Sequence, residues 1–397
     1  MKLTLGPGTL VAAAFIGPGT VTACTVAGAD TGFALIWALV FATLATIIFQ
    51  EMAARLGVIG RLGLGEAMVS GVDNRALKWT LIALVLSALF VGNAAYEAGN
   101  LAGGALGLDA LFGASGESAS KGHVLVIAAI AGTLLAVGKY KLLERALIGL
   151  VLLMSLAFTL SFIVVRPDLG AFFGGLVPSI PEDQLLRVIA LIGTTIVPYN
   201  LFLHAAAARG RWQGGEADLA AAKADTRLSI GLGGLVSIFI LSTAAAALFA
   251  NGISVNSAGE MALALEPVAG ENGRILIGLG LFAAGLTSAI TAPMATAYAV
   301  TELMPAFSQA NKRSAFRVIT LTILAIGLLA SLLGFKSVEL ILFAQIANAL
   351  LLPIIAGFLL LEMNRKSLLG QHVNGPVANM LGGLVLLITL LLLTKLF

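Results

Sequence analysis

Eleven long apolar stretches constrain this chain more than any other feature of its sequence. Most of them reach the ~20 residues that a helix needs to cross the hydrocarbon core of a bilayer. They occupy residues 5–29, 32–54, 79–105, 122–138, 143–165, 184–208, 228–250, 273–303, 315–335, 337–361 and 376–396. Because backbone exposed to lipid must satisfy its own hydrogen bonds, each stretch predicts a helix, and the expected fold class is an all-α polytopic membrane protein.

The charge content excludes the main soluble classes. Charged residues make up 11% of the 397 residues and hydrophobic residues 59%, against about 25% and about 45–50% in soluble domains. So few charges cannot cover a soluble enzyme or a nucleic-acid binder, and so apolar a chain is not disordered. We expect residues 1–397 to form a single transmembrane domain whose partner is the lipid bilayer, with no nucleic acid and no obligate protein partner.

The loops between the stretches carry their positive charges asymmetrically. With the N-terminus in the cytoplasm, 17 of the 23 Lys and Arg residues fall on the cytoplasmic side, as the positive-inside rule requires. We therefore expect a multi-pass protein of a bacterial inner membrane, with the N-terminus inside and the C-terminus outside. The lone Cys24 excludes a disulfide framework, and the first residues lack the cleavage site of a removable signal peptide.

The first stretch is interrupted half-way along by Gly17, Pro18, Gly19 and Thr20. Pro18 lacks a backbone donor and disfavours helical geometry at the residue before it. The flanking glycines lower the cost of leaving the helix. The pattern predicts an unwound segment near the middle of the bilayer, where irregular backbone is tolerated only if it lines a cavity or is covered by protein.

The sixth stretch carries a matching interruption at Thr195, Val197, Pro198, Tyr199 and Asn200. A single proline within a span usually makes only a kink. Two breaks separated by five spans are instead typical of a transporter built from two inverted repeats of five helices, with the site between the broken helices.

This spacing also predicts the boundaries of the repeats. We expect repeat one over about residues 1–165 and repeat two over about 184–361. The eleventh span, at about 376–396, is then an addition to the 5+5 arrangement.

The order of the motifs resembles that of the natural resistance-associated macrophage protein (NRAMP) family. The family's first span reads Gly-Pro-Gly-x-Leu and then Asp-Pro-Gly-Asn, and this chain has related residues at 6–10 and 17–20. The family's sixth span reads Met-Pro-His-Asn-Leu-Tyr-Leu-His, matched here by 197–204. Residues 280–288 and 345–353 resemble motifs of the eighth and tenth spans. The resemblance implies a LeuT-like fold with eleven spans, of which spans 1 and 6 are broken at the midplane.

The chain departs from the family at the residues that the resemblance would make metal ligands. The family binds divalent transition metals with the Asp and Asn of span 1 and the Met of span 6. In place of these residues and of the first His in span 6 stand Gly17, Thr20, Val197 and Tyr199. Of the family's Asp-x-x-Glu in span 3 only Glu97 remains, and Asn200 is the one side-chain ligand kept.

A site so altered contains hydroxyls, an amide and helix ends, but neither a carboxylate nor a thioether. A dication would lack charge compensation there, whereas the N-termini of half-helices favour anions. We therefore expect a secondary active transporter, working by alternating access, of a small anion or neutral polar solute, with bicarbonate as the concrete example. Na⁺ or H⁺ is the expected coupling ion, and no other cofactor is expected. Transport of a divalent metal cation such as Mn²⁺, Fe²⁺ or Mg²⁺ is the alternative reading, and a non-transporting sensor on the same scaffold is a third.

The expected residues fall into two groups, and none of them is catalytic because the sequence holds no pattern of an enzyme. The substrate-binding group is Gly17, Pro18, Gly19, Thr20, Thr195, Val197, Pro198, Tyr199 and Asn200. The coupling or gating group is Glu97, His204, Ser288, Gln345 and Asn348. An intramembrane carboxylate such as Glu97 is a functional candidate by default, and His204 titrates near neutral pH in water. No metal-ligand cluster is expected, and a channel is disfavoured because the spans lack a continuous polar stripe.

Overall fold

A computed structural model describes residues 6–113, 119–138, 141–181, 183–304 and 312–396. Within these ranges every regular element is a helix and no strand occurs. The part of the chain predicted as the first repeat contains α1 (Pro7–Phe15), α2 (Pro18–Thr31), α3 (Ile36–Arg55), η1 (Leu56–Gly60), α4 (Leu64–Ser70), α5 (Arg75–Phe112), α6 (Lys121–Val137) and α7 (Lys141–Val165). Helix α8 (Leu169–Gly174) lies between the two predicted repeats.

The rest of the described chain, which includes the predicted second repeat and the additional span, is also helical. It contains α9 (Leu185–Thr195), α10 (Pro198–Arg211), α11 (Glu216–Ala247), η2 (Phe249–Asn251), α12 (Ala258–Leu263), α13 (Glu266–Ala269), η3 (Gly270–Asn272), α14 (Gly273–Leu303), α16 (Lys312–Ser331), α17 (Ser337–Glu362), α18 (Lys366–Leu369), η4 (Gly370–His372) and α19 (Pro376–Thr394). Each of the eleven predicted spans coincides with one long helix or one broken pair. Nine segments of the described chain are long and apolar enough to cross a membrane, and the shorter α6 and the pair α1 and α2 supply the other two.

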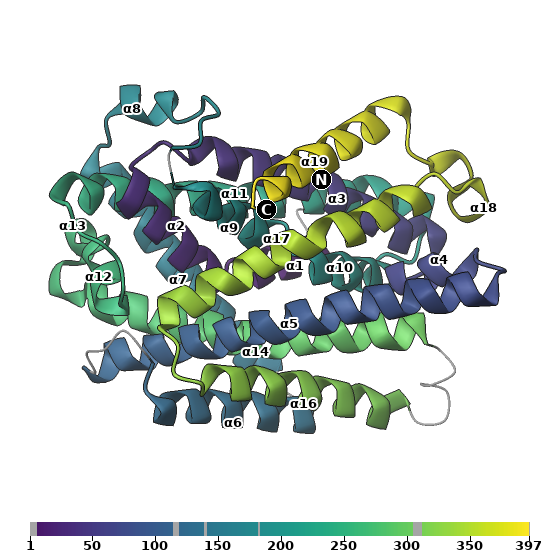
Figure 1. The fold of residues 1–397 in the computed structure, drawn as a ribbon, viewed down its shortest axis with the longest axis horizontal. Coiled ribbons are helices and arrows are strands. Elements are labelled where there is room, and N and C mark those ends of the chain that lie inside the picture. The colour runs from purple at the N-terminus through teal and green to yellow at the C-terminus, as the bar shows by residue number, and fades with distance from the viewer. Residues whose placement is uncertain (1–5, 114–118, 139–140, 182, 305–311, 397) are drawn as a thin grey trace.

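The connections between the long helices gather at two ends of the bundle. In Figure 1, α4 and α18 lie at one end, and α8, α12 and α13 at the opposite end. These ends correspond to the predicted cytoplasmic and external loops, respectively. The structure thus groups the loops as the positive charges do, and the assignment of either end to the cytoplasm stays a prediction.

The centre of the bundle is built around α5, which packs against α14, α16 and α17. Helices α5 and α14 approach so closely because glycine faces glycine: a Cβ on Gly285 would lie 2.4 Å from the Cα of Gly104. Small residues at such contacts let backbones pack closely in membrane proteins. This contact fixes the facing residues of α5 and α14 relative to one another.

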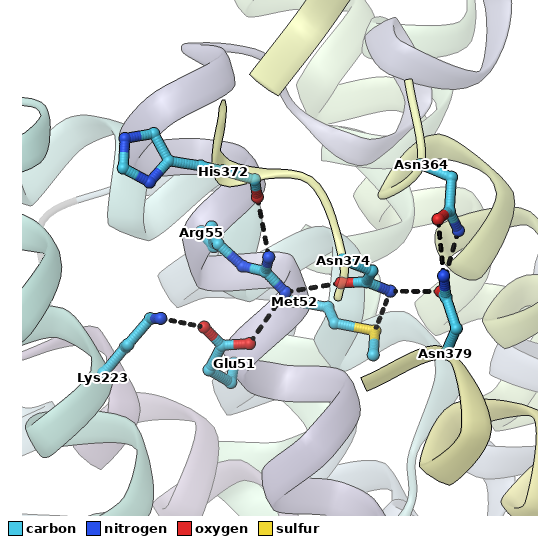
Figure 2. Close-up of polar contacts among 8 residues, drawn as sticks. All are labelled: Glu51, Met52, Arg55, Lys223, Asn364, His372, Asn374 and Asn379. Carbon is cyan, nitrogen blue, oxygen red and sulfur yellow. Dashed lines mark hydrogen bonds and ion pairs between the residues drawn. The ribbon is translucent and has the colours of Figure 1, made fainter. Parts of the chain in front are cut away.

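A network of polar side chains fastens the segment between α17 and α19 to the rest of the bundle (Figure 2). We call this network the clasp, and its residues are Glu51, Met52, Arg55, Lys223, Asn364, His372, Asn374 and Asn379. The Arg55 guanidinium donates to the His372 carbonyl at 2.8 Å and to Asn374 Oδ1 at 2.7 Å. It also pairs with Glu51 at 3.1 Å, and Glu51 pairs in turn with Lys223 of α11 at 3.2 Å. The clasp therefore joins α3, α11 and the start of the eleventh span.

Candidate functional site

The two predicted breaks are present and have the same construction. Helix α1 ends at Phe15 with the N–H of Ile16 bonded back to Ala12, and α9 ends at Thr195 with Ile196 bonded back in the same way. After one further extended residue, α2 and α10 each begin with a proline. Proline suits the first helical position because its fixed φ is already helical and no N–H is needed there. Each break thus presents one C-terminal and one N-terminal helix end.

Threonine side chains hold the two breaks together. The Thr20 hydroxyl lies 2.9 Å from the Thr194 hydroxyl and also donates to the carbonyl of Phe15. Thr46 of α3 donates to the carbonyl of Thr195 at 3.2 Å. These contacts link α2, α1, α9 and α3, so two segments far apart in the sequence form one region.

Several buried side chains around the breaks have at least one polar atom without a hydrogen-bond partner within the described residues. This set comprises Thr22, Tyr96, Glu97, Tyr199, Asn200, Ser288, Gln345 and Asn348. Both polar atoms of the Asn200 amide are unpartnered, although the residue is fully buried. Leaving a buried polar group unpaired costs about 1–3 kcal/mol. A concentration of such groups indicates a site that a ligand satisfies.

Two tyrosines contact each other where the second break meets α5. The rings of Tyr96 and Tyr199 contact each other edge to face, with centroids 5.4 Å apart. Glu97 follows Tyr96 and is fully buried. One of its oxygens accepts from the Asn100 amide at 3.4 Å and the other is unpartnered. Among the ion pairs of the described residues none includes Glu97, so the cluster holds a carboxylate without a fixed positive partner.

The first break faces the same cluster from the other side. A Cβ on Gly17 would lie 2.9 Å from Ser288 Oγ and 3.7 Å from the Tyr96 hydroxyl. Gly19 faces the side-chain amide of Gln345 on α17. Gln345 donates to the carbonyl of Ile341 at 3.1 Å and its Oε1 is left unpartnered. The cluster is therefore assembled from the two breaks and from α5, α14 and α17.

Most of the predicted site residues lie on the segments that build this cluster, namely the two breaks, α5, α14 and α17. They are Gly17, Pro18, Gly19, Thr20, Val197, Pro198, Tyr199, Asn200, Glu97, Ser288, Gln345 and Asn348. Within this set Thr20 braces the backbone, while Pro18 packs against Gly103 of α5. Val197 is the residue before α10 and presents an apolar side chain.

Two predicted residues have partners elsewhere. The Thr195 hydroxyl donates to the Leu191 carbonyl of its own helix at 3.0 Å. His204 lies one turn beyond Asn200, and its Nδ1 is 2.9 Å from Gln50 Oε1 on α3. Both side chains therefore make these hydrogen bonds outside the cluster.

Tyr96 and Gln50 were not among the predicted residues, but the structure places Tyr96 in the cluster and pairs Gln50 with His204. Tyr96 stands directly before Glu97 inside the Asp-x-x-Glu motif of span 3, which is the signal that identifies it. Gln50 is an amide near the end of an apolar stretch and nothing in the sequence pairs it with His204.

Comparison with known proteins settles the family. Residues 8–397 match the profile of the natural resistance-associated macrophage protein-like family, called Nramp. The chain belongs to the Nramp family. As an Nramp member it is a multi-pass membrane transporter and not an enzyme.

Individual relatives agree with this assignment. The chain is 26% identical over 396 residues to the divalent metal cation transporter MntH of Yersinia enterocolitica, with 98% of this chain and 93% of the relative covered. It is 28% identical over 397 residues to the protein of the same name from Yersinia pestis, with the same coverage.

Solved structures confirm the fold. A mutant of the manganese transporter of Eremococcus coleocola superposes with a TM-score of 0.77 at 21% identity, covering 98% of this chain and 85% of that one. Mhp1, a nucleobase-cation-symport-1 family transporter, superposes with a TM-score of 0.60 at 15% identity, covering 98% and 91%. The LeuT-like arrangement of two five-helix repeats and an eleventh helix, with spans 1 and 6 broken, is therefore the fold of this Nramp protein.

The expectation of a small anion or neutral solute, with bicarbonate as the example, is wrong. The relatives that match nearly the whole chain are named divalent metal cation transporters, which agrees with the alternative reading. That expectation placed no carboxylate at the breaks, whereas Glu97, the neighbour of Tyr96 in the chain, is a buried carboxylate without a positive partner among the described residues. Its argument for an anion rested on the N-terminal helix ends, whereas each break also contributes a C-terminal end whose carbonyls attract cations.

Proposed function

We propose that this Nramp protein transports a divalent metal cation by alternating access, through a site between the α1–α2 and α9–α10 breaks. The names of its MntH relatives support this substrate class. The observation that carries the site is the set of buried, unpartnered oxygen and amide groups gathered at the two breaks. A cation would be bound by groups that the protein itself leaves without partners.

The donor set favours harder cations over softer ones. The side chains at the cluster offer hydroxyl, amide and carboxylate oxygens, and Val197 offers no thioether. Within the described residues no group of three or more His, Cys, Asp or Glu is arranged to hold a metal ion. Oxygen ligands suit Mg²⁺ and Mn²⁺, and thioether and thiolate ligands suit softer metals. We therefore expect Mn²⁺ and Mg²⁺ to be preferred to Cd²⁺.

Glu97 supplies the charge that the first break lacks. A buried carboxylate without a positive partner is costly unless it is protonated or meets a cation. The transported cation is the missing partner in this proposal, and a proton takes its place when the site is empty. This exchange favours H⁺ over Na⁺ as the coupling ion. Tyr96 is next to Glu97 in the chain and contacts Tyr199 at the second break, so the two hydroxyls would pass a proton between the carboxylate and the site.

Uptake into proteoliposomes tests the proposal directly. The purified chain should give saturable uptake of Mn²⁺, and Mg²⁺ should compete more effectively than Cd²⁺. Asn200→Ala should lose this uptake. Binding of Mn²⁺ without uptake would point to a sensor on the same scaffold, and absence of both binding and uptake would refute the proposed substrate class. Vesicles prepared from a bacterial inner membrane, treated with a protease from one side, would test the predicted location and orientation.

A further inference from the structure

Helix α1 has few connections to the helix that follows it. The N–H of Ile16 bonds back into α1, whereas the N–H groups of Thr20 and Val21 bond to the carbonyl of Gly17 on the other side of the break. Within the described residues no backbone hydrogen bond crosses this point. A side-chain hydrogen bond, from the Thr20 hydroxyl to the carbonyl of Phe15, connects α2 to α1. Helix α1 is therefore a separate rigid element that joins α2 through the extended backbone at Gly17.

The opposite end of α1 is held by a single carboxylate. The N–H of Gly6 donates to one oxygen of Asp225 at 2.9 Å, and the N–H of Gly8 donates to the other at 2.7 Å. Asp225 belongs to α11 and is more than 200 positions away in the sequence. The first N–H groups of a helix have no partner inside the helix, and a negative charge at this end is favoured by the helix dipole.

No cation among the described residues pairs with the Asp225 carboxylate. The nearby Lys223 pairs with Glu51 of the clasp at 3.2 Å, and none of the ion pairs among the described residues includes Asp225. Its partners among the described residues are two neutral backbone N–H groups at the start of α1. These hydrogen bonds hold α1 against α11, and breaking them does not separate two opposite charges.

The fit between α1 and α11 is close at this point. A Cβ on Gly8 would lie 2.9 Å from the backbone oxygen of Asp225. Glycine is therefore required at this position if α1 is to reach the carboxylate. The same end of α1 also meets the indole of Trp212, against which a Cβ on Gly6 would lie 2.9 Å away.

We infer that Asp225 is a positioning residue for the transport cycle: its carboxylate latches the start of α1 onto α11 and keeps the site closed at this end of the bundle. Release of the two N–H groups frees α1 to move about the break at Gly17 and opens the site at that end. The inference rests on the proposed alternating access, but not on which ion is carried.

Thiol labelling tests the latch without any substrate. In a Cys24→Ala background, Ser229→Cys places a single thiol one turn beyond Asp225 on the same face of α11, at a position that is 8% exposed. With the latch intact, N-ethylmaleimide should label this thiol slowly. Asp225→Asn should raise the labelling rate about 10-fold, the equivalent of about 1.4 kcal/mol in the opening equilibrium. Asp225→Glu keeps the charge and should label more slowly than Asp225→Asn.

Asp218 supplies the matched control. It lies on the same helix, but its carboxylate accepts from the N–H of Gly214 in its own loop at 2.7 Å. Asp218→Asn should leave the labelling rate unchanged. If Asp225→Asn does not fold, Gly8→Ala offers a second way to push α1 away and should give the same acceleration.

Two results would overturn the latch. One is a labelling rate in both Asp225→Asn and Gly8→Ala within twofold of the parent protein. The other is an equal acceleration in Asp218→Asn, which would show general loosening. Faster labelling together with a complete lack of Mn²⁺ uptake by the parent protein would leave the latch intact and count against the proposed substrate alone.

Discussion

The centre of the clasp, at Arg55 and Asn374, and the site between the breaks are both buried and polar, yet their polar groups are satisfied in opposite ways. In the clasp, Arg55, Asn374 and Asn379 exchange hydrogen bonds among themselves and with nearby carbonyls. In the site, neither polar atom of the Asn200 amide has a hydrogen-bond partner among the described residues. Polar groups that bond to each other stabilise the folded structure. Unpartnered groups that the fold holds in place are available to a ligand.

Asn200→Ala should have the largest effect on transport and a small effect on stability. The amide has no hydrogen bond to lose within the protein, so its removal takes away a ligand without leaving a broken bond. We expect Mn²⁺ uptake to fall about 100-fold, corresponding to about 2.7 kcal/mol, with an unchanged temperature of unfolding.

Asn93 is a buried amide that, unlike Asn200, has a hydrogen-bond partner. This buried amide donates to the Thr296 hydroxyl at 2.5 Å. Asn93→Ala should lower the temperature of unfolding and leave the affinity for Mn²⁺ unchanged. If Asn93→Ala and Asn200→Ala changed Mn²⁺ transport and the temperature of unfolding alike, a missing hydrogen-bond partner would not identify a ligand-binding amide.

Arg55→Met should have the largest effect on stability. It breaks the centre of the clasp and leaves Glu51 with Lys223 alone. Removing one partner of a buried ion pair costs about 3–5 kcal/mol, so thermal unfolding in detergent should shift clearly downward. The preference for Mn²⁺ over Cd²⁺ in protein that remains folded should not change, and a changed preference would show that the clasp shapes the site.

Glu97→Gln should remove the dependence of Mn²⁺ uptake on pH. In the parent protein, lower pH protonates Glu97 and displaces the cation, so the apparent affinity for Mn²⁺ should fall as the pH on the substrate side falls. The neutral variant has no such competition and should bind Mn²⁺ more weakly at every pH. Uptake measured between pH 5.5 and 8 would decide, and an unchanged pH profile in the variant would assign the proton to another group.

Gly17→Asp combined with Val197→Met should add the carboxylate and thioether that the site lacks. The Cβ at position 17 meets only the Ser288 hydroxyl closely, and this hydroxyl is able to rotate away. We expect Mn²⁺ to bind about 10-fold more tightly, or by about 1.4 kcal/mol, and Cd²⁺ to gain more than Mg²⁺. Isothermal titration with the three ions checks the order.

His372→Gln should have the smallest effect. His372 Nε2 lies 3.1 Å from Glu216, whose side chain is 68% exposed. Exposed ion pairs contribute about 0–1 kcal/mol, and the His372 carbonyl that receives Arg55 is kept in the variant. A drop in stability as large as that of Arg55→Met would show that the imidazole is more important to the clasp than its carbonyl.

The sequence predicts the fold well because the decisive signals are local. Apolar length gives the spans, and Pro18 and Pro198 give the breaks at the positions where the structure has them. The substrate was not predictable in the same way. The closeness of Tyr199 to Tyr96 and Glu97 depends on the packing of α10 beside α5, and no spacing in the chain encodes it. The partner of His204 was likewise hidden, because Gln50 lies about 150 positions away.

The close contact of Gly104 with Gly285 has a mechanical consequence. Helices that touch backbone to backbone cannot slide or separate by changing side-chain rotamers, so α5 and α14 behave as one stiff body. Glu97 and Ser288 therefore keep a constant spacing throughout any cycle, whereas Gly17 and Asn200 sit on half-helices that are free to pivot. In the proposed site, the groups on α5 and α14 would keep one arrangement while those on the half-helices would come and go, so movement of the half-helices would release the ion.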